Sequence, residues 1–325
     1  MQMKQIDLQK IKNVDIGQNI NIYCNELEIS DGVQIGDGVS ITAERIKIGA
    51  GTKIQHGVTV KALNGLMSEF RVGDNCLIGF NNQILVPHFS MLDYSQLHNS
   101  GLHSGYQPLT IGYNCWIGQN SILNSTERLT IGDNVRIGTQ SQLWTHVASG
   151  ELLEGCTLFG SAPLTLKDNV WIVGGAVISP GLVLEESSII MTGAVLTKST
   201  KPKHTYAGVP ATDVTEKLNF WKDVSLEEKM KMLHLFVDEF LEKHAEYAGR
   251  VFITNDIMGF DERSEFLIIS DRDFNPQDVN QSLNSYFNVP TKKYTKRRTA
   301  IEVDWIKFTV GFRARFTPYE TSDGP

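Results

Sequence analysis

An aliphatic residue recurs at every sixth position along the first two-thirds of the chain. The stretches VGDNCLIGFNNQIL (72–85), IGYNCWIGQNSILN (111–124), IGDNVRIGTQSQLW (131–144) and LKDNVWIVGGAVIS (166–179) align on this spacing. Continued in both directions, the pattern contains twenty-three Ile, Val or Leu residues, and nine of them are followed directly by glycine. A period of six differs from the 3.6-residue period of a helix, although each short segment alternates like a strand.

The spacing predicts a prism of stacked coils. Three short strands joined by tight turns form one triangular coil, and each strand points one aliphatic side chain inward. We expect the glycines to supply turn conformations that other residues avoid. The small residues in the hexads are expected to pack inside the prism; they are Cys76, Cys115, Ser121 and Ser141.

Two long insertions interrupt the repeat, at Leu85–Pro108 and Trp144–Pro163. Each insertion begins after the third strand of a coil. The two insertions end in similar sequences, QPLTIGYN (107–114) and APLTLKDN (162–169). Insertions of about 20 residues on a rigid solenoid are uncommon unless they are functional. His88 and His146 stand where the two insertions begin.

A histidine in such an insertion suits one kind of chemistry. A neutral imidazole with an ordinary pKa of about 6.5 can accept the proton of an attacking hydroxyl group. A backbone N–H or an amide side chain can stabilise the oxyanion that then develops. A single histidine at a turn is more often solvated or a capping residue, so the surrounding sequence has to decide its role.

The sequence after His146 resembles a known family. Residues 143–212 are similar to the C-terminal half of the maltose, galactoside and nodulation-type sugar O-acetyltransferases. The similarity rests on four stretches: LWTH, PLTLKDNVWIVGGAVISPG, SSIIMTGAVLTKS and YAGVPA. The hexads of residues 14–212 resemble the wider hexapeptide-repeat acyltransferase family. This resemblance implies a left-handed parallel β-helix, a homotrimer, and acyl transfer from acetyl-CoA to a sugar hydroxyl.

The resemblance also implies roles for individual residues. His146 matches the general base, Trp171 the tryptophan beside the acetyl and acceptor groups, and Asn120 an asparagine that contacts the acceptor or the oxyanion. Positions along the CoA groove are matched by Gly174, Thr192, Thr197 and Lys198; Gly193 and Ala194 lie beside them, and Lys201 and Lys203 are within reach of the phosphates.

The chain departs from the family pattern at several of these places. Leu166-Lys167 and Ile172-Val173 replace Ile-Gly pairs, and Thr212 stands where a basic residue usually follows GVPA. These departures change the expected turns and weaken the expected grip on the CoA phosphates.

The first insertion offers a different function. His98 and His103 have an H-x4-H spacing that resembles the paired zinc ligands of γ-class carbonic anhydrases, hydratases of the same fold. Ala62 lies near the place of the third ligand and His56 is misplaced, so we expect no metal. We instead expect His88, His98 and His103 to line the acceptor pocket, with His98 or His103 as an alternative base.

Two further alternatives stay open. The chain could acylate the amine of a nucleotide-linked amino sugar, which needs less help from a base. It could also be a noncatalytic trimeric β-helix whose C-terminal part provides binding. We favour a sugar of a bacterial cell-surface polysaccharide, or its precursor, as the acceptor.

Composition restricts the partners and the compartment. A net charge of −7 and an isoelectric point near 5.6 argue against nucleic acid or an anionic membrane surface. No apolar run approaches the ~20 residues that a membrane span needs, and MQMKQIDLQK lacks the core of a secretory signal. The four cysteines form no CxxC pair. We expect a cytoplasmic protein with reduced thiols.

The hexads stop after GVPA, and we expect the β-helix domain to span residues 1–212. A helical linker or packing segment follows at 213–248, where Ser225 and Glu228 form a capping box. Its apolar stripe consists of Leu226, Met230, Leu233, Val237, Phe240 and Leu241.

Residues 249–325 predict a small α+β domain. RVFITN and EFLIIS read as strands, NPQDVNQSLNSYF as a helix and TAIEVDWIKFTVGF as a strand. Five basic residues lie within 292–298. This basic run is expected to be a solvated turn or, if functional, a site for the diphosphate of a nucleotide sugar or the phosphates of a polymer.

Overall fold

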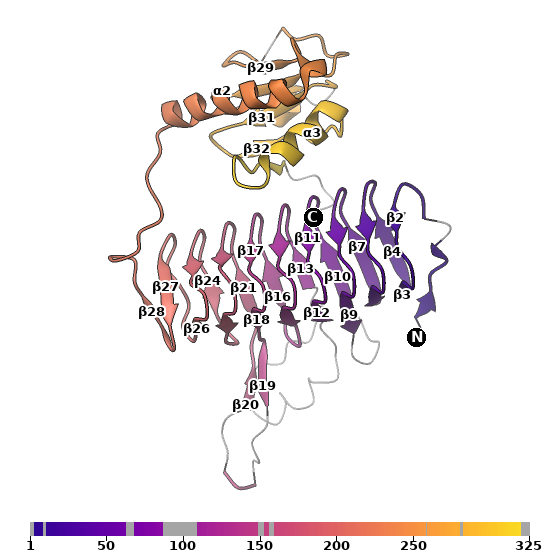
Figure 1. Ribbon diagram of the computed structural model, residues 1–325, viewed down its shortest axis with the longest axis vertical. Helices are drawn as coiled ribbons and strands as arrows, with labels where there is room; N and C mark the ends of the chain where they lie inside the picture. Colours follow the sequence, from indigo (N-terminus) through magenta and orange to yellow (C-terminus); the bar gives the residue numbers. More distant parts are fainter. Residues whose placement is uncertain are drawn as a thin grey trace. The chain divides into compact units, whose positions relative to one another are not determined.

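The computed structural model describes residues 3–8, 11–62, 68–86, 109–148, 153–155, 159–257, 259–279 and 282–319. The chain divides into two compact units, Met1–Trp221 and Lys222–Gly324. Strands make up most of the regular structure in the first unit, and the second combines helices with a sheet (Figure 1).

The strands that build the coils of the first unit lie on three faces, which we name A, B and C. Face A contains β1 (Lys4–Gln5), β3 (Asn21–Cys24), β6 (Ser40–Thr42), β9 (Thr59–Ala62), β12 (Gln83–Val86), β15 (Ile122–Asn124), β18 (Gln142–Leu143), β23 (Val177–Ile178) and β26 (Val195–Leu196). Face B contains β2 (Asp15–Ile16), β5 (Gln34–Ile35), β8 (Lys53–Ile54), β11 (Leu77–Ile78), β14 (Trp116–Ile117), β17 (Arg136–Ile137), β22 (Trp171–Ile172), β25 (Ile189–Ile190), β27 (Thr205–Gly208) and β28 (Ala211–Asp213). Face C contains β4 (Glu26–Ile29), β7 (Arg45–Ile48), β10 (Glu69–Val72), β13 (Leu109–Ile111), β16 (Leu129–Ile131), β21 (Leu164–Leu166) and β24 (Val183–Leu184).

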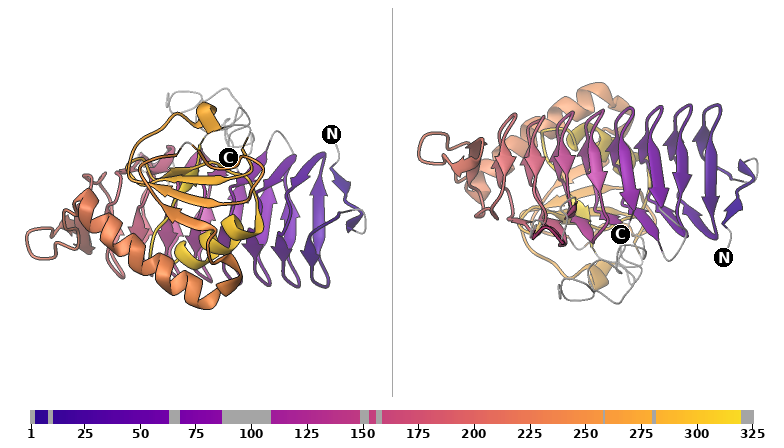
Figure 2. Two further views of the ribbon diagram at one scale, coloured as in Figure 1. Left: turned by 90° about the horizontal axis from the view of Figure 1, so that it is seen from above. Right: turned by 90° about the horizontal axis from the view of Figure 1, so that it is seen from below.

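The chain passes from face C to face B to face A in each coil, and successive coils pair as parallel strands. Ile117 pairs with Ile137 on face B, and Leu123 with Leu143 on face A, so hexad positions stack on hexad positions. The coils repeat along one axis of this unit (Figure 2). The parallel β-helix predicted from the hexads is confirmed.

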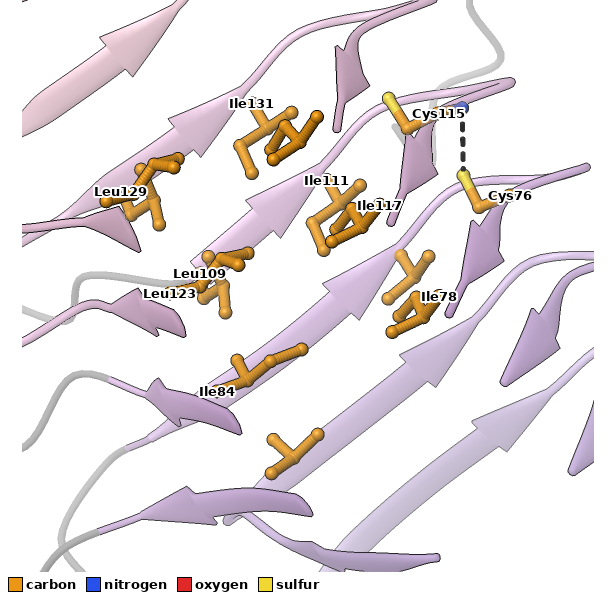
Figure 3. Close-up of a cluster of buried hydrophobic side chains, with 14 of the residues drawn as sticks. Cys76, Ile78, Ile84, Leu109, Ile111, Cys115, Ile117, Leu123, Leu129 and Ile131 are labelled. Carbon is orange, nitrogen blue, oxygen red and sulfur yellow. Dashed lines mark hydrogen bonds between the residues drawn. The ribbon is translucent and has the colours of Figure 1, made fainter. Parts of the chain in front are cut away.

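The core of the prism consists of the aliphatic hexad residues, as predicted. Leu109, Ile111, Ile117, Leu123 and Ile131 are all at most 1% exposed and stack in rows (Figure 3). The small hexad residues are also buried, and their polar atoms have partners. The Cys115 thiol donates to the Gly132 carbonyl oxygen at 3.0 Å, and the Ser121 hydroxyl to that of Gly118 at 3.2 Å. The prism therefore buries these groups without leaving them unsatisfied.

The glycines that follow hexad residues have a different role from the predicted one. None of these nine adopts a positive φ; the left-handed conformation occurs two residues later, as at Asn120 (φ 56°) after Gly118. Each glycine instead faces the next coil so closely that an added Cβ would lie less than 3.0 Å from an atom of that coil. A Cβ at Gly118, for example, would lie 2.6 Å from Thr139 N. The stacking distance between coils, rather than the turn, requires glycine here.

The second unit contains one sheet with the order β29 (Val251–Ile253), β30 (Leu267–Ser270), β31 (Ser285–Asn288), β32 (Lys293–Tyr294), β33 (Thr317–Pro318). The first three strands are parallel, β32 is antiparallel to β31, and β33 is parallel to β32. The helices are α2 (Leu226–Lys243) and α3 (Ala300–Thr309), with short 3-10 turns at η3 (Ala245–Tyr247) and η4 (Pro276–Val279).

Helix α2 belongs to the second unit. Leu233, Val237 and Phe240 are buried in the same core as Phe287 and Trp305. The hexad strands end at β28 and the boundary between the two units falls after Trp221 in the sequence, so α2 is part of the second unit and not a separate segment. The rest of its apolar stripe except Leu226, which is exposed, packs partly buried against this core.

Two elements of this unit differ from the sequence-based expectation. TAIEVDWIKFTVGF forms helix α3 rather than a strand, because the Thr299 side chain accepts from Glu302 N and caps the helix. Ile301 and Trp305 then lie one turn apart in the core. NPQDVNQSLNSYF was expected to be one helix, but its start forms η4 and its end forms strand β31.

The basic run 292–298 does not form one solvated patch. The Lys292 Nζ lies 4.0 Å from the centre of the Phe316 ring, and burial together with Lys229 and Arg315 lowers the pKa of Lys292 to about 8. The Arg297 guanidinium donates to the Val279 carbonyl oxygen at 2.6 Å. These contacts give part of the run a structural role.

In the described residues, no helix has the length and apolar character that a membrane crossing needs. Cys24, Cys76 and Cys115 are free and buried, and Cys156 lies outside the described residues.

The capping box of α2 gives a test of the second unit. Both of its bonds are present, with Ser225 Oγ accepting from Glu228 N and the Glu228 carboxylate accepting from Ser225 N. Ser225→Ala should lower the Tm of the second unit by about 5 °C, because an N-cap side chain satisfies an otherwise unpaired amide. Thermal unfolding monitored by circular dichroism measures this. Ser225→Asp is the control that keeps a cap, and equal melting of the two variants would contradict the assignment.

Candidate active site

The second insertion begins as a hairpin at the edge of face A. After β18 the chain forms β19 (His146–Ala148), which pairs antiparallel with β20 (Phe159–Ser161), and His146 lies opposite Ser161. The hairpin extends away from the coils (Figure 1). His146 is therefore at its base, at the corner where face A turns toward face C, which we call the A/C corner.

The imidazole of His146 is held through one nitrogen. Its Nδ1 lies 3.0 Å from Asn124 Oδ1 and 3.1 Å from Thr126 Oγ1. Within the part of the chain that the structure describes, Nε2 forms no hydrogen bond. Burial lowers the pKa of His146 below its usual 6.5, because the charged form loses hydration. At neutral pH the ring is therefore uncharged and Nε2 can act as an acceptor.

A buried network fixes the base of the hairpin. The Thr145 hydroxyl accepts from Glu127 N at 3.0 Å and donates to the carbonyl oxygen of Asn124 at 3.1 Å. The Glu127 carboxylate accepts from the Ser161 hydroxyl at 2.8 Å, across from His146. Thr145 is fully buried and Asn124 is 1% exposed. The network joins the coil before the insertion to both strands of the hairpin.

The other two predicted catalytic residues lie elsewhere on the prism. Asn120 lies at the corner between faces B and A, which we call the B/A corner. Strand β15 runs from this corner to the A/C corner, a distance of ~13 Å. Its φ of 56° matches that of other corner asparagines, so the turn itself accounts for an asparagine there. Trp171 is 46% exposed on face B, beside Arg136 and Ile189. One copy of the chain does not bring His146, Asn120 and Trp171 together.

The residues predicted for the CoA groove border the C-terminal part of face A. Gly174, Thr192 and Gly193 lie at the B/A corner, where Gly193 N donates to the Gly174 carbonyl oxygen at 3.0 Å. Thr197 and Lys198 are exposed where face A ends in the last coil, two coils beyond His146. Ala194 points into the core and can offer only backbone atoms. Lys201 lies beyond face A, and its N–H donates to the Tyr206 hydroxyl at 2.9 Å.

The histidines of the first insertion, His88, His98 and His103, lie outside the described residues. Over the described ranges, no group of three or more His, Cys, Asp or Glu side chains is arranged to hold a metal ion. The predicted roles of the three histidines at the acceptor stay predictions.

Part of the chain is similar in sequence to known acetyltransferases. No family model matches the chain. The galactoside O-acetyltransferase of Escherichia coli K12 is 33% identical over 124 residues, which are 36% of this chain and 61% of that protein. Nodulation protein L of Rhizobium meliloti is 30% identical over 105 residues, 32% of this chain and 57% of that protein. These relatives agree with the hexads and the prism. They bear out the resemblance of the chain to the hexapeptide-repeat acyltransferases.

The match to these hexapeptide-repeat relatives is partial, since the chain spans about three-fifths of their length. Among solved structures, the polysialic acid O-acetyltransferase OatWY matches 65% of this chain and 92% of its own, at 16% identity and a TM-score of 0.45.

Sequence reasoning missed several residues of the candidate site. Asn124, Thr126 and Glu127 surround His146 but precede it by about one coil, and Ser161 comes from the far end of the insertion. One signal was present in the sequence. The polar run 124–127 occupies the short A/C corner one coil before the corner that carries the insertion, so stacking places the two corners side by side.

Proposed function

We propose that this chain transfers an acyl group, with acetyl-CoA as donor, to a sugar hydroxyl of a bacterial cell-surface polysaccharide or its precursor in the cytoplasm. One observation carries the proposal. His146 presents a neutral imidazole at an edge of face A, its Nε2 is unpaired among the residues that the structure describes, and the residues that match the CoA groove border the same face.

His146 acts as the general base in this reaction. Its Nε2 takes the proton of the acceptor hydroxyl while the hydroxyl oxygen attacks the thioester carbonyl carbon. The tetrahedral oxyanion is stabilised by backbone N–H groups of the coils or by Asn120. When the carbon–sulfur bond breaks, the imidazolium returns the proton to the CoA thiolate. The sugar ester and CoA leave, and His146 is neutral again.

A homotrimer is part of the proposal. His146 and Trp171 lie on different faces of one prism, so a site that contains both takes Trp171 from a second copy. The 46% exposure of Trp171 in one copy fits a side chain that becomes covered in an assembly.

Two measurements test the proposed function. Calorimetric titration with acetyl-CoA separates an enzyme from a noncatalytic scaffold, which would not bind it. A thiol-release assay with oligosaccharides, nucleotide sugars and amino sugars then identifies the acceptor class. We expect release with hydroxyl acceptors. Release confined to amino sugars would contradict O-acylation and favour N-acylation.

A further inference from the structure

We propose that Asn124 is the positioning residue of His146: its side-chain oxygen fixes the imidazole as the Nδ1–H tautomer and leaves Nε2 as the acceptor. The inference rests on the proposed role of His146 as base, but the tautomer can be measured without any substrate.

The surroundings of Asn124 determine which of its amide atoms faces His146. Three groups surround the Oδ1 position: Thr126 N at 3.3 Å, Thr145 Oγ1 at 3.1 Å and His146 Nδ1 at 3.0 Å. A backbone N–H can only donate, so the atom facing Thr126 N has to be oxygen rather than the amide nitrogen. The Thr126 N–H therefore orients the Asn124 amide before it contacts the histidine, and the Thr145 hydroxyl, whose single proton can go to either the backbone carbonyl or Oδ1 of Asn124, is compatible with this orientation.

The oxygen then selects the tautomer. A carbonyl oxygen cannot donate, so a hydrogen bond at 3.0 Å requires the proton on Nδ1. The Thr126 hydroxyl, 3.1 Å from Nδ1, can accept from the same N–H. In the opposite tautomer the lone pair of Nδ1 would face a lone pair of the buried Asn124 oxygen, which is unfavourable. The proton is thus kept on Nδ1, and Nε2 has the lone pair that a general base needs.

An uncharged partner also affects the titration of His146. A carboxylate at position 124 would stabilise the imidazolium and raise the pKa of the histidine. With an amide there, burial dominates and the pKa of His146 is lowered. The charged side chain in this network is Glu127, whose carboxylate accepts from Ser161 rather than from His146; Arg128 follows it along the chain. Asn124 thus orients the base while leaving it neutral at neutral pH.

Asn124→Asp is the sharpest test, because all three neighbours can donate to a carboxylate in the same place. Nitrogen-15 NMR of the imidazole should show the Nδ1–H tautomer in the unaltered chain. In Asn124→Asp the pKa of His146 should rise by about one pH unit or more. The acid limb of the kcat profile should move to higher pH by the same amount.

Asn124→Ala should mix the tautomers and lower kcat by about 10²-fold with KM nearly unchanged, because the wrong tautomer cannot accept the proton. The control is Asn19→Gly in the first coil, an exposed asparagine with φ 55° that glycine can replace. Thermal unfolding checks that each variant is folded. An Nε2–H tautomer in the unaltered chain, or an unchanged pKa in Asn124→Asp, would overturn the inference. If the tautomer is as expected but His146→Ala stays active, the positioning holds and the proposed function fails.

Discussion

His146→Ala should lower the rate of acyl transfer by about 10²- to 10⁴-fold, the usual contribution of a positioned general base. Acetyl-CoA binding should be nearly unchanged, because the groove residues lie along the C-terminal coils and His146 contacts Asn124 and Thr126. The measurement is kcat from thiol release, together with the dissociation constant of acetyl-CoA from calorimetry.

The matched control is His56→Ala. This histidine accepts from Asp37 N at 2.8 Å and stacks on Phe80 several coils before the insertion, so its loss should leave kcat unchanged. His98→Ala and His103→Ala test the first insertion. If either abolishes activity while His146→Ala retains it, the base has been assigned to the wrong insertion.

The pH profile of the unaltered chain follows from the lowered pKa of His146. Burial disfavours the imidazolium, so half of the histidine is protonated only at a pH below 6.5. The acid limb of kcat should therefore lie below pH 6.5. A limb clearly above 6.5 would indicate a base with a charged partner or another group.

Gly138→Ala should produce the largest loss of stability of any single methyl addition in the prism. A Cβ at Gly138 would lie 1.8 Å from the Val173 carbonyl oxygen and 2.7 Å from the Gly174 Cα. Backbone atoms cannot turn aside as a side chain does, so strands β17 and β22 would have to separate. Overpacking of this kind costs about 3 kcal/mol, which corresponds to a fall in Tm of about 10 °C for a unit of this size.

The control for this prediction is Gly38→Ala. A Cβ there meets no atom within 4 Å, and the φ of +67° makes the only penalty a local backbone strain. Gly138→Ala should melt well below Gly38→Ala in calorimetry. Equal melting temperatures would show that the coils can move apart and that stacking distance does not explain the hexad glycines.

Much of the β-helix could be predicted from the sequence, because inward positions recur with one period and each must be apolar. The reason for the glycines could not, since the close approach of Gly118 to Thr139 joins residues of two coils. Helix α3 was mistaken for a strand because Ile301, Val303 and Trp305 alternate along the sequence. The helix is stabilised by the Thr299 cap and by the packing of Trp305 in the core. The core packing depends on residues far away in the sequence, so it is visible only in the structure.

The candidate site could be predicted only in part. The insertion and the sequence that follows it indicated His146 as the base. Asn124, the partner of His146, lies 22 positions earlier in the sequence and is part of no recognisable motif. Stacking of coils brings the two together. Asn120 and Trp171 were grouped with His146 by resemblance, and the geometry of a single chain places them at another corner and on another face.

Transfer of a labelled acetyl group tests the central claim most directly. The chain is incubated with acetyl-CoA carrying a deuterated acetyl group and with a panel of oligosaccharides and nucleotide sugars, and the products are analysed by mass spectrometry. The account predicts a sugar that gains one labelled acetyl ester, with one CoA thiol released per ester, and the loss of both in His146→Ala. A folded protein that yields no labelled sugar with any acceptor, or equal labelling by His146→Ala, would contradict it.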